Sequence, residues 1–323
     1  MAAVPPAAPT PTSPAPKRSF RIDPVWITFV VLLALWVFSL VRVEGFRTVD
    51  YNLFTLRVAA FLGIVAAGQT LVVLMGGIDL SVAAVVTMAG VVGGNLLTTM
   101  GEAPGILLTL AICALVGVAN GLGVVYLRLP PLVMTLASLS VIQGVLLVYN
   151  AGKPVSGKSE FLTFWALGNV WRIPTPVVAL AIISVVCIVL LQRTAYGRAI
   201  YAIGNNPRAA LLSGVPVNAT QVATYALCSL LAGIAGLLVL GRTGYSSKTA
   251  GDPFLLMSIA AVVVGGTSIL GGRGKFIGTI GGALVLTILV NVLTVESIPE
   301  AGRMIVQGAL ILVLLIAYAY TEQ

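Results

Sequence analysis

VAAFLGIVAAGQTLVVLMGGIDLSVAAVVTMAGVVGGNLLTTMG, residues 58–101, carries a single charged residue, Asp79, between two apolar runs. Each run is close to the roughly 20 residues that an α-helix needs to cross the hydrocarbon core of a bilayer. The stretch therefore predicts two membrane-spanning helices, joined at the glycine-rich break MGGIDLS, residues 75–81.

Charge-free runs of similar length recur along the whole chain. Hydrophobic residues make up 59% of the chain and charged residues 9%, whereas soluble proteins have roughly 25% charged residues. The pattern predicts an all-α, polytopic integral membrane protein with about ten transmembrane helices, in a permease domain over residues 23–321. Residues 1–22, rich in Ala and Pro, are expected to form a disordered cytoplasmic tail. The ten runs are 24–41, 58–78, 80–101, 103–127, 129–152, 173–192, 209–241, 253–272, 276–295 and 304–321.

The distribution of basic residues does not decide the orientation of these spans. If the N-terminus is cytoplasmic, nine Lys and Arg residues lie on the inner side and nine on the outer side. The positive-inside rule therefore favours neither orientation. Lys17, Arg18 and Arg21 directly precede the first run and favour a cytoplasmic N-terminus. An even number of spans then predicts a cytoplasmic C-terminus as well.

Several classes of function are excluded by residue usage. The chain has no histidine, which removes His-based acid–base chemistry and His-ligated metal sites. Cys113, Cys187 and Cys228 each lie within an apolar run and have no metal-type spacing. We expect no metal, no cofactor, and no nucleic-acid partner, since no basic patch is interleaved with aromatic residues.

The longest polar connection, RTAYGRAIYAIGNNPRAALLSGVPV at residues 193–217, contains a short-helix signal. Asn206 is a favourable N-cap, and Pro207 follows at the first helical position. Arg208 to Ser213 can form about a turn and a half of helix, and Gly214 stands where a left-handed residue ends a helix. Because such a helix is far too short to span a bilayer, we expect it to lie outside the membrane.

Two glycine-rich segments separate spans and predict tight turns. Both follow an apolar run that ends in Gly-Gly, LVVLMGG (71–77) and AAVVVGG (260–266), which indicates two related halves of the chain. The residues predicted to form structural turns are Gly76, Gly77, Asp79, Gly265, Gly266, Gly271, Gly272 and Gly274. Gly278 and Gly282 are four residues apart, which allows a neighbouring helix to approach closely.

Asp79 admits two interpretations. An intramembrane carboxylate is a candidate proton or cation site, but Asp79 also stands where it can cap the helix that follows the break. We favour the cap, because no partner charge is visible in the neighbouring spans. The length of residues 58–101 also leaves room for Asp79 at the water interface.

GKPVSGKS, residues 152–159, matches the nucleotide-binding pattern GxxxxGK[ST]. A P-loop requires a preceding strand to aim its amides at phosphate, whereas here a predicted membrane span precedes the motif. We therefore interpret it as a hydrophilic outer loop. The segment 161–171, too short to span, is expected at the membrane interface with Trp165 and Trp171.

Uncharged polar residues within the spans have two possible roles. Such groups usually form hydrogen bonds between helices, but they could also line a path for a hydroxyl-rich solute. The candidates for that path are Gln69, Asn95, Asn120, Gln143 and Asn291.

Four stretches resemble the permease subunit of ribose-type ATP-binding-cassette (ABC) sugar importers. They are GGIDLSVAAVVTMAG (76–90), TAYGRAIYAIGNNPRAALLSGV (194–215), YALCSLLAGIAGLL (225–238) and IAAVVVGGTSILGGRGKFIGTIGGAL (259–284). The resemblance, over about residues 25–320, implies a bacterial inner-membrane permease with cytoplasmic termini, present as two copies or a paralogous pair. It also implies a cytoplasmic ABC ATPase and a periplasmic sugar-binding protein as partners.

The resemblance further implies that the 193–217 segment is a cytoplasmic coupling segment touching the ATPase. The residues that match are Asn206, Pro207, Arg208, Ala209, Ala210, Ser213 and Gly214. Related ABC permeases often have Glu-Ala-Ala here, where this chain has Arg208-Ala209-Ala210, so the acidic contact is missing.

We therefore expect a non-catalytic subunit that translocates a monosaccharide similar to ribose, xylose or galactose, using ATP hydrolysed on a partner. The alternatives are an ABC permease for another hydroxylated solute, such as a signalling molecule or nucleoside, and an ion-coupled secondary transporter. An intramembrane protease or hydrolase is disfavoured, since neither a pair of membrane carboxylates nor a GxSxG motif is present.

Overall fold

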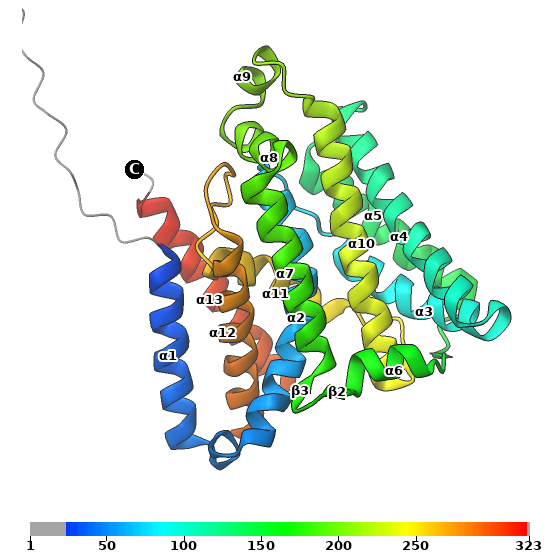
Figure 1. The fold of residues 1–323 in the computed structure, drawn as a ribbon, viewed down its shortest axis with the longest axis vertical. Helices are drawn as coiled ribbons and strands as arrows, with labels where there is room; N and C mark the ends of the chain where they lie inside the picture. The colour runs from blue at the N-terminus through cyan, green and yellow to red at the C-terminus, as the bar shows by residue number, and fades with distance from the viewer. Residues whose placement is uncertain (1–23, 322–323) are drawn as a thin grey trace, which may run out of the picture.

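The computed structural model describes the backbone of residues 24–321, and the side chains of all of these except 310, 311 and 313–321. This region is a helical bundle (Figure 1), as the apolar runs predicted. Eight of its helices are long and apolar enough to cross a membrane. They are α1 (Pro24–Arg42), α2 (Val49–Leu74), α3 (Val82–Met100), α4 (Glu102–Val125), α5 (Pro131–Asn150), α7 (Thr175–Arg193), α10 (Val217–Thr243) and α12 (Phe276–Val295).

Two further helices correspond to the remaining predicted spans. Helix α13 covers Glu300–Thr321 and has 22 residues. Helix α11 covers only Asp252–Val264, so the prediction of a span over 253–272 was too long. At 1.5 Å per residue, α11 is about 20 Å long and is shorter than the roughly 30 Å hydrocarbon core. The run is charge-free, but its glycines end the helix and turn the chain at residue 265.

Short elements gather at the two ends of the bundle (Figure 1). Helices α8 (Ala195–Asn205) and α9 (Pro207–Leu212) lie toward the end at which α1 begins and α13 finishes. Helix α6 (Glu160–Leu167) and the hairpin of β2 (Asn169–Val170) and β3 (Ile173–Pro174) lie at the opposite end. The remaining elements are the 3₁₀ helix η1 (Glu44–Arg47) and the antiparallel pair β1 (Val155–Ser156) and β4 (Tyr245–Ser246).

Helices α2, α3 and α10 form the centre of the bundle, and glycines allow their neighbours to approach. A Cβ atom at Gly117 of α4 would lie 2.3 Å from the Tyr225 carbonyl oxygen of α10. One at Gly278 would lie 1.9 Å from the Gly265 oxygen, and one at Gly282 would lie 2.0 Å from the Ala261 oxygen. The close approach predicted from the Gly278–Gly282 spacing therefore joins α12 to α11 and to the turn that follows α11.

The outer helices α1, α5 and α7 are covered with exposed apolar side chains. Trp26 and Val41 of α1, Val145 and Val148 of α5, and Val185 of α7 are among them. In water such a surface would be unfavourable, whereas in a bilayer it faces hydrocarbon. This chain is therefore a multi-pass membrane protein.

The two glycine-rich breaks begin with the same local structure. At the end of α2, the N–H of Gly76 donates to Val73 O (2.9 Å) and the N–H of Gly77 donates to Val72 O (3.0 Å). At the end of α11, Gly266 donates to Val263 O (2.8 Å) and Thr267 to Val262 O (3.2 Å). Both are Schellman motifs with a left-handed glycine, φ +84° in each case. In the structure, Gly76 corresponds to Gly266, because each is the left-handed residue of its motif. Aligning the two Gly-Gly pairs in the sequence would instead match Gly76 with Gly265, so the two alignments differ by one residue.

Candidate functional site

Helix α9 is capped at both ends by the residues that the sequence singled out. The Asn206 side chain accepts from the N–H groups of Arg208 (3.0 Å) and Ala209 (3.1 Å), and Pro207 occupies the first turn. At the other end Gly214 has φ +80°, its N–H donates to Leu211 O, and Val215 donates to Ala210 O, each at 3.0 Å. This Schellman motif follows Ser213, the C-cap. Local interactions therefore fix a helix of only six residues.

Helix α8 precedes α9, and the sequence reasoning missed it. The Thr194 side chain caps its start by accepting from Gly197 N–H at 3.1 Å. Its buried side chains include Ile203 and two residues that precede it by three and four positions, Ile200 and Ala199, so all three share one face. That spacing is typical of an amphipathic helix and could have predicted α8. The arginines and glycines around it instead favoured a polar connection.

Two tyrosines attach α8 to the bundle. The hydroxyl groups of Tyr196 and Thr224 lie 2.7 Å apart, which joins α8 to α10. Burial raises the pKa of Tyr196 to about 12, so its hydroxyl stays protonated. Tyr201 donates to the Gly274 carbonyl at 3.0 Å. These bonds connect α8 to a spanning helix and to the second glycine-rich break.

Both glycine-rich breaks meet beneath the end of α8. The N–H of Gly272 donates to Leu74 O at 2.8 Å, which joins the second break to the end of α2. A Cβ atom at Gly204 would lie 2.0 Å from the same Leu74 oxygen, and Asn205 donates to Gly272 O at 3.3 Å. Displacement of α8 would therefore act directly on the two points where the helical bundle is interrupted.

The outward surface of α9 carries two exposed leucines. Leu212 is 89% exposed and Leu211 is 62% exposed, while Arg208 beside them is also exposed. Only Ala210 of this helix is buried. Figure 1 shows α9 projecting beyond the rest of the bundle. The two leucines were absent from the residues predicted for this site, because a leucine in an apolar run gives no sign that it faces outward.

Asp79 lies inside the molecule, so the expectation of a place at the water interface was wrong. Its side chain is fully buried. One carboxyl oxygen, Oδ1, accepts from the Ser81 N–H at 2.9 Å and from the Ser81 hydroxyl at 2.6 Å. Helix α3 begins at Val82 with Ser81 as its N-cap residue. Asp79 therefore stabilises the turn from two residues before the N-cap, Ser81, rather than occupying the cap position itself.

A buried hydrogen-bond network extends from this turn to three helices. With its amide oriented to satisfy both groups, Gln69 of α2 donates to Asp79 O (3.1 Å) and accepts from Asp79 N–H (3.2 Å). Asn120 of α4 donates to the Ser81 hydroxyl at 2.8 Å and accepts a short hydrogen bond from Ser138 of α5. The break is thus held by polar groups from α2, α4 and α5, which favours a structural role for Gln69 and Asn120.

Replacing Asp79 should separate its structural role from an ionic one. Asp79→Ala leaves the Ser81 N–H and hydroxyl buried without their acceptor and should cost on the order of 3 kcal/mol in the free energy of unfolding. Asp79→Asn keeps an acceptor oxygen and should cost less than half as much. Thermal unfolding of purified protein in detergent measures both, with Gln143→Ala as the control. An unfolding temperature in Asp79→Ala equal to that of the wild type would contradict the assignment.

The other three polar candidates lie apart from this network. Asn291 of α12 donates to Thr55 of α2 at 3.0 Å. Asn95 of α3 is half-buried, and Gln143 lies on the exposed face of α5. Among the described residues, no side-chain hydrogen bond holds Asn95 or Gln143 in place. The structure therefore leaves these two, of the five, with free amide groups.

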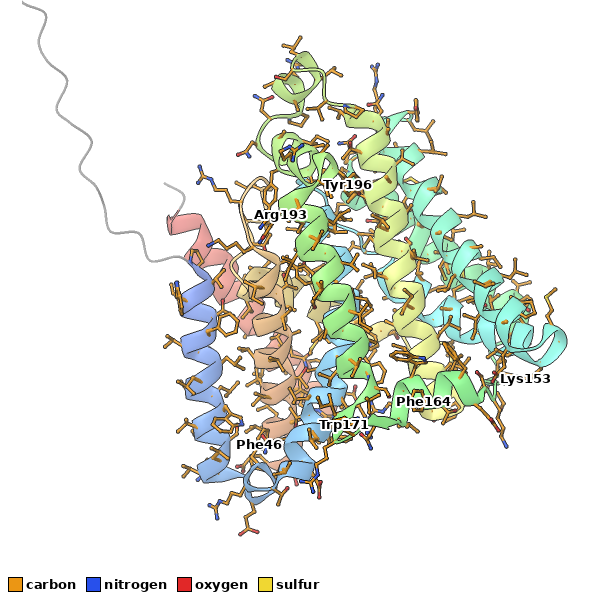
Figure 2. The ribbon with its side chains drawn as sticks, viewed as in Figure 1. Phe46, Lys153, Phe164, Trp171, Arg193 and Tyr196 are labelled. Carbon is orange, nitrogen blue, oxygen red and sulfur yellow. The ribbon has the colours of Figure 1, made fainter. Side chains whose placement is uncertain are left out.

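Residues 152–159, which match the P-loop pattern, form a surface loop that is fixed by hydrogen bonds to the rest of the protein. The Gly157 N–H donates to Gly244 O at 3.2 Å, and Ser159 caps α6 by accepting from Leu162 N–H at 3.1 Å. The element before the loop is helix α5, not a strand. Figure 2 shows Lys153 at the end of the molecule where α6 lies, far along the bundle from α9 in Figure 1.

We expect Lys158→Ala to leave nucleotide-dependent activity unchanged, because the amides and the hydroxyl of this loop are already used within the protein. The measurement is the rate of ATP hydrolysis by the assembled complex. A loss of hydrolysis in Lys158→Ala, with normal assembly, would show that the loop does bind nucleotide.

Comparison with known proteins gives consistent matches over most of the chain. Residues 51–315 match the family described as branched-chain amino acid transport system / permease component. The ribose import permease protein RbsC of Bacillus subtilis (strain 168) is 37% identical over 261 residues, 80% of this chain and 81% of that protein. RbsC of Escherichia coli (strain K12) is 34% identical over 291 residues, 88% and 90% of the two chains. The autoinducer 2 import system permease protein LsrD of Escherichia coli O9:H4 (strain HS) is 33% identical over 298 residues, 89% and 90%.

Proposed function

This chain belongs to the permease family of ribose-type ABC importers, and we propose that it carries a monosaccharide inward using ATP hydrolysed on a separate subunit. It is a multi-pass protein of the bacterial inner membrane and a permease for sugar-like solutes. The observation that carries the proposal is the rigid, doubly capped helix α9, which presents two exposed leucines and is joined through α8 to both breaks. In this proposal the permease does no covalent chemistry itself.

The proposed partner of α9 is a cytoplasmic ABC ATPase. Exposed leucines on a short rigid helix suit an apolar groove on another protein, since burial of Leu211 and Leu212 would be favourable there. Closure of an ATPase pair would push α9 and α8 together, because the caps make the segment stiff. The motion would reach Leu74 and Gly272, where the bundle is interrupted and able to rearrange.

A second copy or paralogous subunit is the proposed neighbour of α5. This helix exposes Gln143 and Ser140 beside apolar residues, and a free amide facing hydrocarbon would be costly. Covering the face with a second permease subunit would place Gln143 at a water-accessible seam. A path there would need uncharged polar groups of this kind for a neutral, hydroxyl-rich solute. Asn95 is the other path candidate with a free amide.

The experiment is uptake of radiolabelled ribose, xylose, galactose and fructose into vesicles containing this chain, its ATPase and its periplasmic sugar-binding protein. We expect ATP-dependent uptake of at least one sugar. Uptake of autoinducer 2 alone would support the second candidate, another hydroxylated solute, which the similarity to LsrD favours. Uptake that continues without the ATPase and stops when ion gradients are dissipated would instead establish a secondary transporter.

A further inference from the structure

A cavity of about 600 Å³ opens at the end of the bundle opposite α9 and far from the two glycine-rich breaks that α8 joins. Its walls come from the first turns of α2 and from the β2–β3 hairpin. The lining residues are Val49, Asp50, Leu53, Phe54, Arg57, Asn169, Trp171 and Arg172. The cavity thus combines two guanidinium groups with an apolar wall, and one carboxylate, that of Asp50, also lines it.

The positive charge of Arg57, at this cavity, is not neutralised by an ion pair with any described residue. One of its Nη atoms donates to Asn169 Oδ1 at 3.1 Å, while its Nε is enclosed without a hydrogen-bond partner. No ion pair reaches Arg57, Arg172 or Arg242 within residues 24–321. Arg242, which lies over the rings of Phe54 and Phe61 at 5.9 and 5.7 Å, repels Arg57 electrostatically. An anion in the cavity would not reach the enclosed Nε, but it would accept from the part of the Arg57 guanidinium that lines the cavity and would offset this repulsion.

The remaining walls match an alkyl chain rather than a second charged group. Val49 and Phe54 are exposed, and Trp171 is 97% exposed at the tip of the hairpin. Trp171 also has φ +60°, at the first position of a two-residue turn, where glycine is favoured. The two-residue turn requires the positive φ, but it does not require a bulky apolar side chain at this exposed position. Contact of the ring with the membrane interface would explain it, since tryptophan concentrates there.

The depth of the cavity fits the headgroup layer of a bilayer. The spanning helix α7 begins at Thr175, three residues after Arg172. Arg57 stands eight residues into α2, about 12 Å along its axis. Figure 2 shows Trp171 at the same end of the molecule as Phe46, where α1 and α2 are joined. In a bilayer that begins where α7 begins, Arg57 and Arg172 would lie near the height of the phosphate groups.

We propose that this cavity is a phospholipid site, in which Arg57 and Arg172 bind the phosphodiester and Leu53, Phe54 and Trp171 contact the first part of an acyl chain. Asp50 leaves the lining with a net charge of one positive unit, which suits a single phosphodiester. Charge complementarity selects phosphate, and the amphipathic walls select a lipid over a small anion. The site would fix the outer end of α2 against the hairpin, and it is independent of which sugar is carried.

The test uses the full-length protein, purified in detergent and examined by native mass spectrometry with added phosphatidylglycerol, phosphatidylethanolamine or diacylglycerol. We expect the phospholipids to bind about tenfold more tightly than diacylglycerol, and Arg57→Gln or Arg172→Gln to remove about that factor. Arg172 is exposed on the hairpin, so its replacement should not disturb folding. Lys158→Gln, an exposed cation at the same end of the molecule, is the matched control and should bind like the wild type.

Three results would overturn the proposal. Equal binding of diacylglycerol and phospholipid would show that the guanidinium groups do not select phosphate. Displacement of the lipid by inorganic phosphate at the lipid's own concentration would show a small-anion site. Unchanged lipid binding in both arginine variants, together with weakened capture of the soluble sugar-binding protein, would assign the cavity to a carboxylate of that protein.

Discussion

Leucine at both Gly278 and Gly282 is expected to prevent assembly of the folded protein. Added side chains would begin with Cβ atoms 1.9 Å from Gly265 O and 2.0 Å from Ala261 O. These neighbours are backbone atoms of α11 and its C-cap, so relief requires movement of that whole helix. Overpacking costs about 1–3 kcal/mol per site when side chains can shift, and more is expected here. The sum is a large part of a typical 5–15 kcal/mol total stability.

The measurement is the yield of monodisperse protein after detergent extraction and its thermal unfolding temperature. Gly308→Leu on α13 is the matched control, because a Cβ atom there meets nothing within 4 Å. That variant should be extracted in normal yield. A double variant of Gly278 and Gly282 that unfolds at the wild-type temperature would show that α11 and α12 are not packed by backbone contact.

Features encoded by neighbouring residues could be predicted from the sequence. The ends of α9 depend on Asn206, Pro207 and Gly214, all within nine residues, and the structure places them as the N-cap, the first helical residue and the left-handed residue after the C-cap. The number of apolar runs likewise predicted an all-α membrane protein. Both predictions rest on periodicity and local hydrogen bonding, which require no knowledge of the tertiary structure.

Features that depend on distant residues could not be predicted. The charge-free run 253–272 contains nothing that marks the end of α11 except glycines, which also occur inside helices such as α12. Asp79 was expected as a cap. Its burial, and the hydrogen bonds between its backbone and the Gln69 side chain, depend on how the break folds back against α2. The exposure of Leu212 and Gln143 likewise depends on which neighbours pack against α9 and α5.

Aspartate at Leu212 is expected to abolish ATP-driven uptake while leaving the permease folded. Leu212 is 89% exposed, so the isolated permease loses no core packing. In the proposed complex the leucine would enter an apolar groove of the ATPase, and a buried unpaired carboxylate there would be strongly unfavourable. Loss of a buried anchor residue commonly costs 2 kcal/mol or more, or roughly thirtyfold in affinity. We expect co-purification of the ATPase and sugar uptake to fall by at least about that factor.

The same contact can be disturbed through the backbone, which distinguishes a coupling helix from a simple connector. Gly214 has φ +80° and no atom within 4 Å of its would-be Cβ, so any effect of Gly214→Val arises from conformation alone. A β-branched residue is a poor fit to that region, whereas asparagine is tolerated. Gly214→Val should therefore impair uptake as Leu212→Asp does, and Gly214→Asn should retain most of it. Normal ATPase binding, hydrolysis and uptake in both Leu212→Asp and Gly214→Val would mean that the force from the ATPase enters elsewhere, with Arg273 and Lys275 on the second break as the next positions to test.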